Sequence, residues 1–108
     1  MSEIHVILHV NFYDDPENPT SKTHHGMIAA KSVRFAFPPR AGDRLFPYIL
    51  GPDNTDQPIV QHVQHGPKFN DETGPAEAIV TVTARFNQKV VDHLEQTEGW
   101  MPHLDHRY

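Results

Sequence analysis

Histidine is the residue with the most chemistry to offer in this chain, because nine of its 108 residues are histidines and none is cysteine. Imidazole nitrogens bind metals when two or more converge on one ion at about 2.0–2.1 Å. His62 and His65 lie three residues apart, a spacing that sends them to opposite faces of a strand. His5 and His9 share a face but lie about 13 Å apart along it. A metal site therefore needs a cross-strand partner such as His62, and no other cofactor is expected.

Arginines with the same strand parity as these histidines indicate a second kind of site. Arg34 and Arg85 fall on the polar side of two predicted strands, as do His5, His9 and His62. If these strands are neighbours, their side chains line a shallow groove for an anionic small molecule or an acidic peptide. The alternative is an ordinary solvated sheet face, because alternating polar residues are typical of any half-buried strand. The residues on this parity are His5, His9, Ser32, Arg34, His62, Gln64, Thr81, Thr83 and Arg85.

The sequence contains no recognisable catalytic motif. The absence of cysteine excludes thiol nucleophiles and thiolate metal sites. Paired carboxylates, a phosphate-cradling glycine loop and a Ser-His-Asp signature are also not found as motifs. We therefore assign no catalytic residue and no enzyme class.

Five segments with β patterns must position these side chains. Residues 3–13 and 77–86 alternate apolar and polar positions, and residues 27–37, 44–50 and 58–65 show shorter or interrupted versions of that pattern. Asn87 is a favourable cap for a helix over residues 88–98, which a tail of residues 99–108 follows. The chain is predicted to form one domain, residues 1–108. Its expected fold is mainly β, a five-stranded, mostly antiparallel bent sheet or small open barrel with one C-terminal helix.

The parity of the apolar residues predicts which side of each strand faces the core. The second strand is expected either to carry a β-bulge or to extend beyond the core near Lys31, and the fourth strand to place Val60 on its outer side. In the helix, one stripe of Val90, Val91 and Leu94 faces inward. The strand residues assigned to the core side are Ile4, Val6, Leu8, Val10, Phe12, Met27, Ala29, Val33, Phe35, Phe37, Ile59, Val63, Ala78, Val80, Val82, Ala84 and Phe86.

A proline-rich turn separates the second and third predicted strands. The two prolines at 38–39 lack amide donors, so a central strand cannot continue through them. Gly42 can adopt positive φ, and the Asp43 carboxylate can accept hydrogen bonds from nearby amides. Arg40 and Arg44 flank the turn and, with Asp43, form a candidate rim for an anionic ligand. The alternative is a purely structural connection.

One pattern in this region resembles that of known proteins. It reads Pro39-Arg40-x-Gly42-Asp43-x-Leu45, followed by Val60-x-x-Val63-x-His65. It is similar to small uncharacterised bacterial and phage-associated β proteins in which Pro-Arg-x-Gly-Asp turns join strands. It is distantly similar to SH3-like small barrels. The resemblance covers about residues 33–66 and implies a β fold, but it carries no catalytic residue to this chain.

The charge and hydropathy of the chain restrict its partners. A net charge of −5, from 14 acidic and 9 basic residues, disfavours binding to the phosphate backbone of nucleic acids. No stretch approaches the roughly 20 apolar residues that span a bilayer. We therefore expect a cytoplasmic protein with neither nucleic acid nor membrane as a partner.

By elimination, the sequence favours a small noncatalytic module that binds another protein. The resemblance suggests an accessory or inhibitor protein from a phage or mobile element. The alternative is a small-molecule or metal-binding protein that uses the histidine-bearing sheet face. A homodimer that pairs through a sheet edge is a further alternative.

Overall fold

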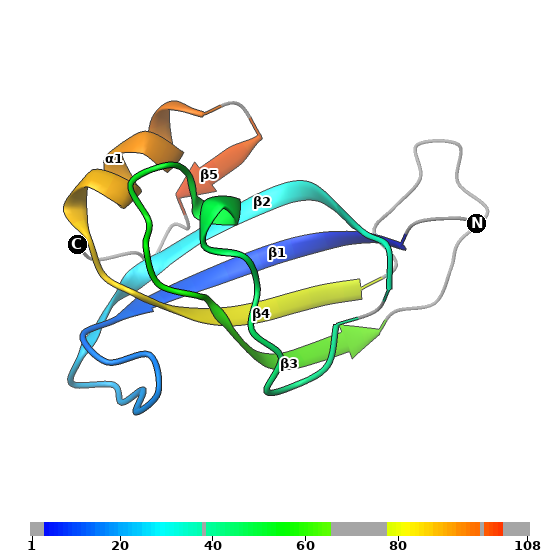
Figure 1. Ribbon diagram of the computed structural model, residues 1–108, viewed down its shortest axis with the longest axis horizontal. Coiled ribbons are helices and arrows are strands. Elements are labelled where there is room, and N and C mark those ends of the chain that lie inside the picture. The colour runs from blue at the N-terminus through cyan, green and yellow to red at the C-terminus, as the bar shows by residue number, and fades with distance from the viewer. Residues whose placement is uncertain (1–3, 38, 66–77, 98, 103–108) are drawn as a thin grey trace.

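A mixed five-stranded sheet is the framework of the protein (Figure 1). The computed structural model describes residues 4–37, 39–65, 78–97 and 99–102. The strands are β1 (Ile4–Tyr13), β2 (His24–Phe35), β3 (Ile59–His65), β4 (Ala78–Arg85) and β5 (Trp100–Pro102), in the order β3-β4-β1-β2-β5. The central pair β1 and β4 is parallel, and the other three pairs are antiparallel. The prediction of a mainly β fold with one C-terminal helix is confirmed, and the sheet is open rather than closed into a barrel.

The core lies on one face of β1 and β4. Leu8 pairs with Val80 and Val10 with Val82, and all four side chains are fully buried. The alternation that the sequence shows in both strands places every second residue on this face. The prediction for these two strands is confirmed at the buried positions Val6, Leu8, Val10, Phe12, Ala78, Val80, Val82 and Ala84.

The helix α1 (Gln88–Gln96) buries its apolar stripe against this core. The Asn87 side chain accepts a hydrogen bond from the Lys89 amide at 2.9 Å, which confirms the predicted cap. Val90, Val91 and Leu94 are buried, as the spacing predicts. The chain then reverses, and β5 pairs with the Ile28–Ala30 part of β2. Half-buried Trp100 packs against the core, whereas the rest of the predicted tail, residues 103–108, lies outside the described residues.

A register shift in β2 confirms the bulge, one of the two predicted alternatives near Lys31, and it changes which residues face the core. Val6 pairs with Val33 and Leu8 with Ala30, so β2 uses one more residue than β1 across this interval. An extra residue exchanges the two faces of a strand. Ala30 and Ile28 are therefore buried, and the assignment of Met27 and Ala29 to the core side was wrong.

A second shift, in β3, has the same effect. The register jumps between Val60, which pairs with Val82, and His62, which pairs with Thr81. Val60 is buried, and Ile59 pairs with Thr83 of the opposite face. The prediction that placed Ile59 inward and Val60 outward was therefore wrong.

The predicted strand over residues 44–50 was also wrong. Arg44 makes a single bridge to Ile59, and a 3-10 helix, η1 (Pro47–Leu50), follows. Pro47 cannot donate to a ladder but is well suited to the first turn of a helix. The turn directs Leu50 into the core, where it is fully buried. The fifth strand of the sheet is instead β5, from the segment that the sequence assigned to the tail. No helix among the described residues is long and apolar enough to cross a membrane.

Candidate functional site

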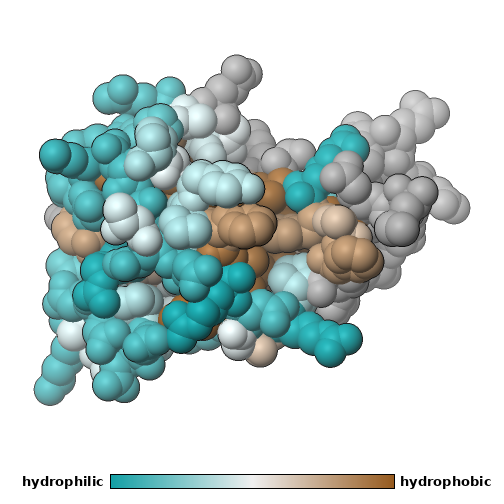
Figure 2. Space-filling view, viewed as in Figure 1, coloured by the Kyte–Doolittle hydropathy of each residue, from teal (hydrophilic) through white to brown (hydrophobic). Residues whose placement is uncertain are grey.

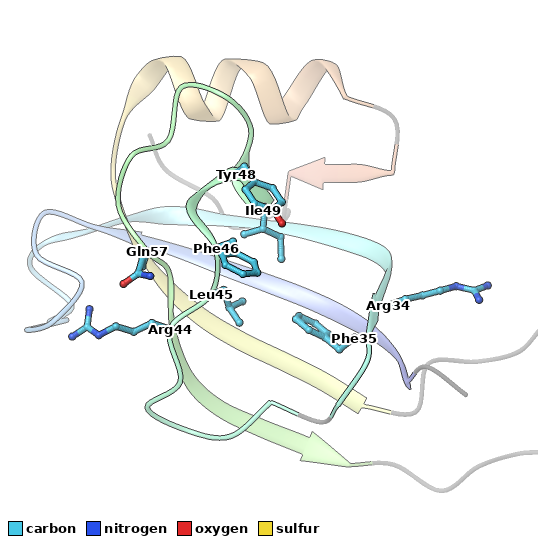
Figure 3. A pocket seen from close by; sticks show the side chains of 8 residues that line it. All are labelled: Arg34, Phe35, Arg44, Leu45, Phe46, Tyr48, Ile49 and Gln57. Atoms are coloured by element: carbon cyan, nitrogen blue, oxygen red, sulfur yellow. The ribbon is translucent and has the colours of Figure 1, made fainter. Parts of the chain in front are cut away.

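An apolar hollow lies where the connection between β2 and β3 crosses the core-bearing face of the sheet. This connection, residues 36–58, passes in front of the strands in Figure 1. Figure 2 shows apolar residues gathered in a depression on this face, with hydrophilic residues beside it. The hollow has a volume of about 360 Å³ and is lined by Arg34, Phe35, Arg44, Leu45, Phe46, Tyr48, Ile49 and Gln57 (Figure 3). Its size falls within the roughly 300–1,000 Å³ of small ligand sites.

Two exposed aromatic rings form one lip of the hollow. Phe46 is 68% exposed and Tyr48 is 71% exposed, and their rings stack with centroids 5.3 Å apart and planes 10° from parallel. Tyr48 faces outward because η1 is anchored by Leu50 on its inner side. Half-buried Phe35, Leu45 and Ile49 pack against the core below. The hollow thus has an apolar floor that is continuous with the core.

A third exposed aromatic residue lies outside the hollow. Phe37, which the sequence assigned to the core side, is 71% exposed and does not line the hollow. That assignment was wrong because β2 ends at Phe35, two residues before Phe37.

The wall of the hollow is fixed by backbone pairing to β3. The Gly42 amide donates to the Val60 carbonyl at 2.7 Å, and the Val60 amide donates to Asp43 at 2.8 Å. The Leu45 amide donates to the Pro58 carbonyl at 2.8 Å. Residues 42–45 therefore lie along the outer edge of β3 and are held there by backbone hydrogen bonds.

Side chains fix the remainder of the connection. Asn54 is nearly buried, and its Nδ2 donates to the Pro47 and Asp56 carbonyls at 2.8 and 2.7 Å. Arg85 Nε donates to Asp56 Oδ2 at 2.8 Å. These bonds tie the start of η1 to the segment 54–56, and Asp56 to β4, so contacts within the chain hold the connection in place.

Gly51 brings the connection close to α1. Its φ is +98°, and a Cβ at this position would lie 2.5 Å from Cδ2 of His93. Only glycine fits here without movement, because positive φ disfavours a side chain and the imidazole occupies the space. His93 is thus a packing residue of the helix.

The polar side chains of the hollow lie at its two ends. Figure 3 shows Arg34 at one end and Arg44 with Gln57 at the other, with both guanidinium groups reaching away from the apolar centre. Arg44 donates to Glu17 Oε1 at 2.7 Å, with both side chains about half exposed. The rim is therefore polar and the centre is apolar.

The opposite face of the sheet carries the histidines that the sequence selected. In strand register His62 pairs with Thr81, and Thr81 pairs with His9, so the three residues form one row across β3, β4 and β1. Two strand spacings, roughly 10 Å, separate the two histidines. The described ranges contain no group of three or more His, Asp or Glu side chains that could hold a metal ion.

The five predicted ligand residues are not brought to one place. His5 pairs with Arg34 near the start of β1, whereas Arg85 pairs with Tyr13 at its end. Arg85 is held there by Asp56 and by the Asp14 carbonyl, to which its Nη1 donates at 2.8 Å. These positions, eight residues apart along β1, are separated by about 26 Å.

The hairpin loop between β1 and β2 covers one end of this second face. Thr83 is 2% exposed, and its hydroxyl donates to the carbonyl of buried Pro16 at 3.0 Å. His25 Nε2 lies 2.5 Å from Asp14 Oδ1, a contact that ties the loop to the start of β2. The loop therefore covers Thr83 at this end of the predicted groove.

Of the predicted turn rim, Arg40 and Asp43 serve the turn itself, and Arg44 lines the hollow. Gly42 has φ of +93°, and Asp43 Oδ2 accepts a hydrogen bond from the Arg40 amide at 2.8 Å, so the predicted turn chemistry is confirmed. Among these rim residues Arg44 lines the hollow, while the other two do not.

Sequence reasoning missed the aromatic lip because it read residues 44–50 as a strand. The signal was the near-continuous apolar run of Leu45, Phe46, Tyr48, Ile49 and Leu50 around Pro47. An edge strand with one buried face does not need consecutive apolar residues, so some of them had to be exposed.

The fold and the site define a small open-sheet β protein with an aromatic-lipped apolar hollow beside the connection between β2 and β3. A scan against protein-family models and searches of curated proteins and of solved structures found no match.

Proposed function

We propose that the protein is a noncatalytic module that binds another protein through the apolar hollow and its aromatic lip. The observation that carries the proposal is the exposure of Phe46 and Tyr48, 68% and 71%, beside a hollow with an apolar floor. Exposed aromatic side chains next to a preformed pocket are typical of the residues that dominate binding energy in protein interfaces.

The exposure of the lip favours a protein over a small molecule. Small-ligand sites bury about 70–90% of the ligand between their walls. Here the stacked rings of Phe46 and Tyr48 project beyond the apolar floor of the hollow. A small molecule that fills the volume of about 360 Å³ would therefore leave the outer surfaces of both rings in water. A protein surface covers the rings and also inserts an apolar side chain between them and Phe35. The expected partner surface therefore presents an aliphatic or aromatic anchor.

The fixed geometry of the connection supports tight binding. Pairing to β3, the Asn54 bonds and the Arg85–Asp56 ion pair hold the wall of the hollow before a partner arrives. Preorganisation lowers the entropy that is lost on association. Binding in this way is consistent with an accessory or inhibitor role, in which the module acts by occupying its partner's surface.

A displayed library of random 12-residue peptides tests this proposal. Selection on the wild-type protein is combined with depletion on the Phe46→Ser/Tyr48→Ser double variant, and enriched peptides are measured by fluorescence anisotropy. We expect peptides with an apolar anchor that lose about tenfold or more in affinity for the double variant. The stability of the double variant should change by less than about 0.5 kcal/mol per exposed site, which urea unfolding measures.

Phe37→Ser is the matched control. Phe37 is an aromatic residue with the same 71% exposure as Tyr48, but it lies outside the hollow. We expect this variant to bind the enriched peptides as the wild type does. Equal weakening by Phe37→Ser, or a selection that enriches no lip-dependent peptide, would contradict the proposed function.

A further inference from the structure

The charged side chains that line the hollow are all basic. The chain carries a net charge of −5, yet the charged side chains that line the hollow are Arg34 and Arg44, and none is acidic. A basic rim in an acidic protein favours a partner of opposite local charge.

The Arg44 end of the hollow has its own counter-charges. Arg44 pairs with Glu17 at 2.7 Å, and next to Gln57 the Asp56 carboxylate pairs with Arg85 at 2.8 Å. Each arginine at this end therefore already faces a carboxylate, and a partner gains little by adding another.

The Arg34 end differs. Arg34 is exposed, and its register partner across β1 is His5, which brings no negative charge. Within the described parts of the chain, no ion pair involves Arg34. Among the described residues, the Arg34 guanidinium is thus the charge at the rim that has no ion-pair partner.

The β2 backbone sets the geometry at this end. Neighbouring residues in a strand point to opposite sides, so Phe35 turns into the hollow while Arg34 reaches away from it. Figure 3 shows this arrangement, with the guanidinium beyond the end of the hollow. A carboxylate that meets Arg34 therefore lies beside the apolar anchor and not within the hollow.

We infer that the hollow recognises a protein segment in which an acidic residue flanks the apolar anchor, with Arg34 as the residue that selects the acid. The inference rests on the proposed function, because it names the partner chemistry of the same site. The apolar lip supplies affinity, and Arg34 fixes the direction in which the segment lies across the hollow.

A double-mutant cycle with the enriched library peptides tests this inference. Each peptide is synthesised with its acidic residues and with Asp→Asn or Glu→Gln replacements, and both forms are titrated against the wild type and Arg34→Gln. We expect the acidic form to bind the wild type about threefold more tightly, the size of an exposed ion pair. Arg34→Gln should remove this preference, and so should a rise in salt concentration.

Arg40→Gln is the matched control, because Arg40 is an exposed arginine in the connection between β2 and β3 and does not line the hollow. It should keep the wild-type preference for the acidic peptide. Lip-dependent peptides that carry no excess of acid, or an equal effect of Arg40→Gln, would overturn the inference and leave the proposed function standing. A selection without lip-dependent peptides would overturn both. Displacement of the peptide by low concentrations of 4-phenylbutyrate would mean that Arg34 binds the carboxylate of a small molecule. This result would also overturn the inference.

Discussion

The two faces of the sheet are built from the same strands but differ in how far other elements cover them. On one face Leu8, Val10 and Val82 are fully buried beneath α1, η1 and the connection that forms the hollow. On the other face His9 and Ile7 are only half-buried and His62 is exposed, and the hairpin loop covers the end near Thr83. The comparison teaches that the residues with the most chemistry lie on the less enclosed face, whereas the formed hollow lies on the apolar one.

The difference in cover follows from the side chains on each face, which are apolar on one and mostly polar on the other. Apolar side chains gain free energy only when another layer covers them, so the apolar face gathers the helix and the long connection. The connection does not cover all of that face, and the hollow is the part left open. Polar side chains such as His62 are satisfied by water and require no covering layer.

The largest test of this comparison is a pair of adjacent substitutions on β1. Leu8→Ala should lower the free energy of unfolding by about 2.7–5 kcal/mol, because it leaves a cavity in a closely packed core. Ile7→Ala, on the half-buried face, should cost about 1 kcal/mol, because less apolar area is lost. Urea unfolding of both variants measures the ratio. Equal losses would mean that the histidine-bearing face is as well covered as the core, for example by a second copy of the chain.

A smaller effect is expected where the connection meets α1. Gly51→Ala combines positive φ with a Cβ only 2.5 Å from the His93 ring, and we expect it to cost about 2–4 kcal/mol. Gly42→Ala has nearly the same φ, +93°, with no heavy atom within 4 Å of the added Cβ. It should cost only the backbone strain, about 1–2 kcal/mol.

Thermal unfolding of these variants separates strain from crowding. His93→Ala in the Gly51→Ala background removes the ring that the new Cβ would meet. We expect this second change to recover part of the loss in Gly51→Ala. If Gly42→Ala and Gly51→Ala cost the same, the contact between the connection and α1 does not help to hold the hollow in place.

The smallest effect is expected on the histidine-bearing face. His62→Gln replaces an exposed side chain and should change the stability by less than about 0.5 kcal/mol. We also expect equimolar zinc to shift the unfolding midpoint equally in the wild type and in this variant. The histidines near the C-terminus are present in both proteins, so they cancel in the comparison. A larger zinc shift in the wild type would support the metal-binding alternative in place of the protein-binding proposal.

The sequence predicted the strands in which one periodicity runs without interruption. β1 alternates over almost its full length, β4 keeps its apolar core residues on one parity, and the Asn87 cap and the Val90, Val91 and Leu94 stripe define α1. Near Lys31 the sequence left a bulge and an extension beyond the core as alternatives. It did not predict the change of face, because parity continued through a bulge assigns one half of the strand to the wrong face. The bulge after Val60 left no comparable signal in the sequence.

The candidate site was less predictable than the fold. The histidine-bearing set shares a parity, but parity does not fix position along a strand, and His5 and Arg85 lie at opposite ends of β1. The hollow depends on how residues 36–58 fold over the sheet, which is decided by tertiary contacts such as those of Leu50, Asn54 and Gly51. Local pattern contains no information on such contacts beyond the excess of apolar residues around Pro47.

The pairing of residues 42–45 with Val60 has a consequence for solubility. An open sheet has two edges, and an uncovered edge is a template on which other chains aggregate. Here the segment that forms the wall of the hollow also occupies the hydrogen-bonding groups of Val60 on the side of β3 away from β4. Any substitution or partner that lifts this segment therefore exposes a strand edge, and precipitation would be its first visible sign.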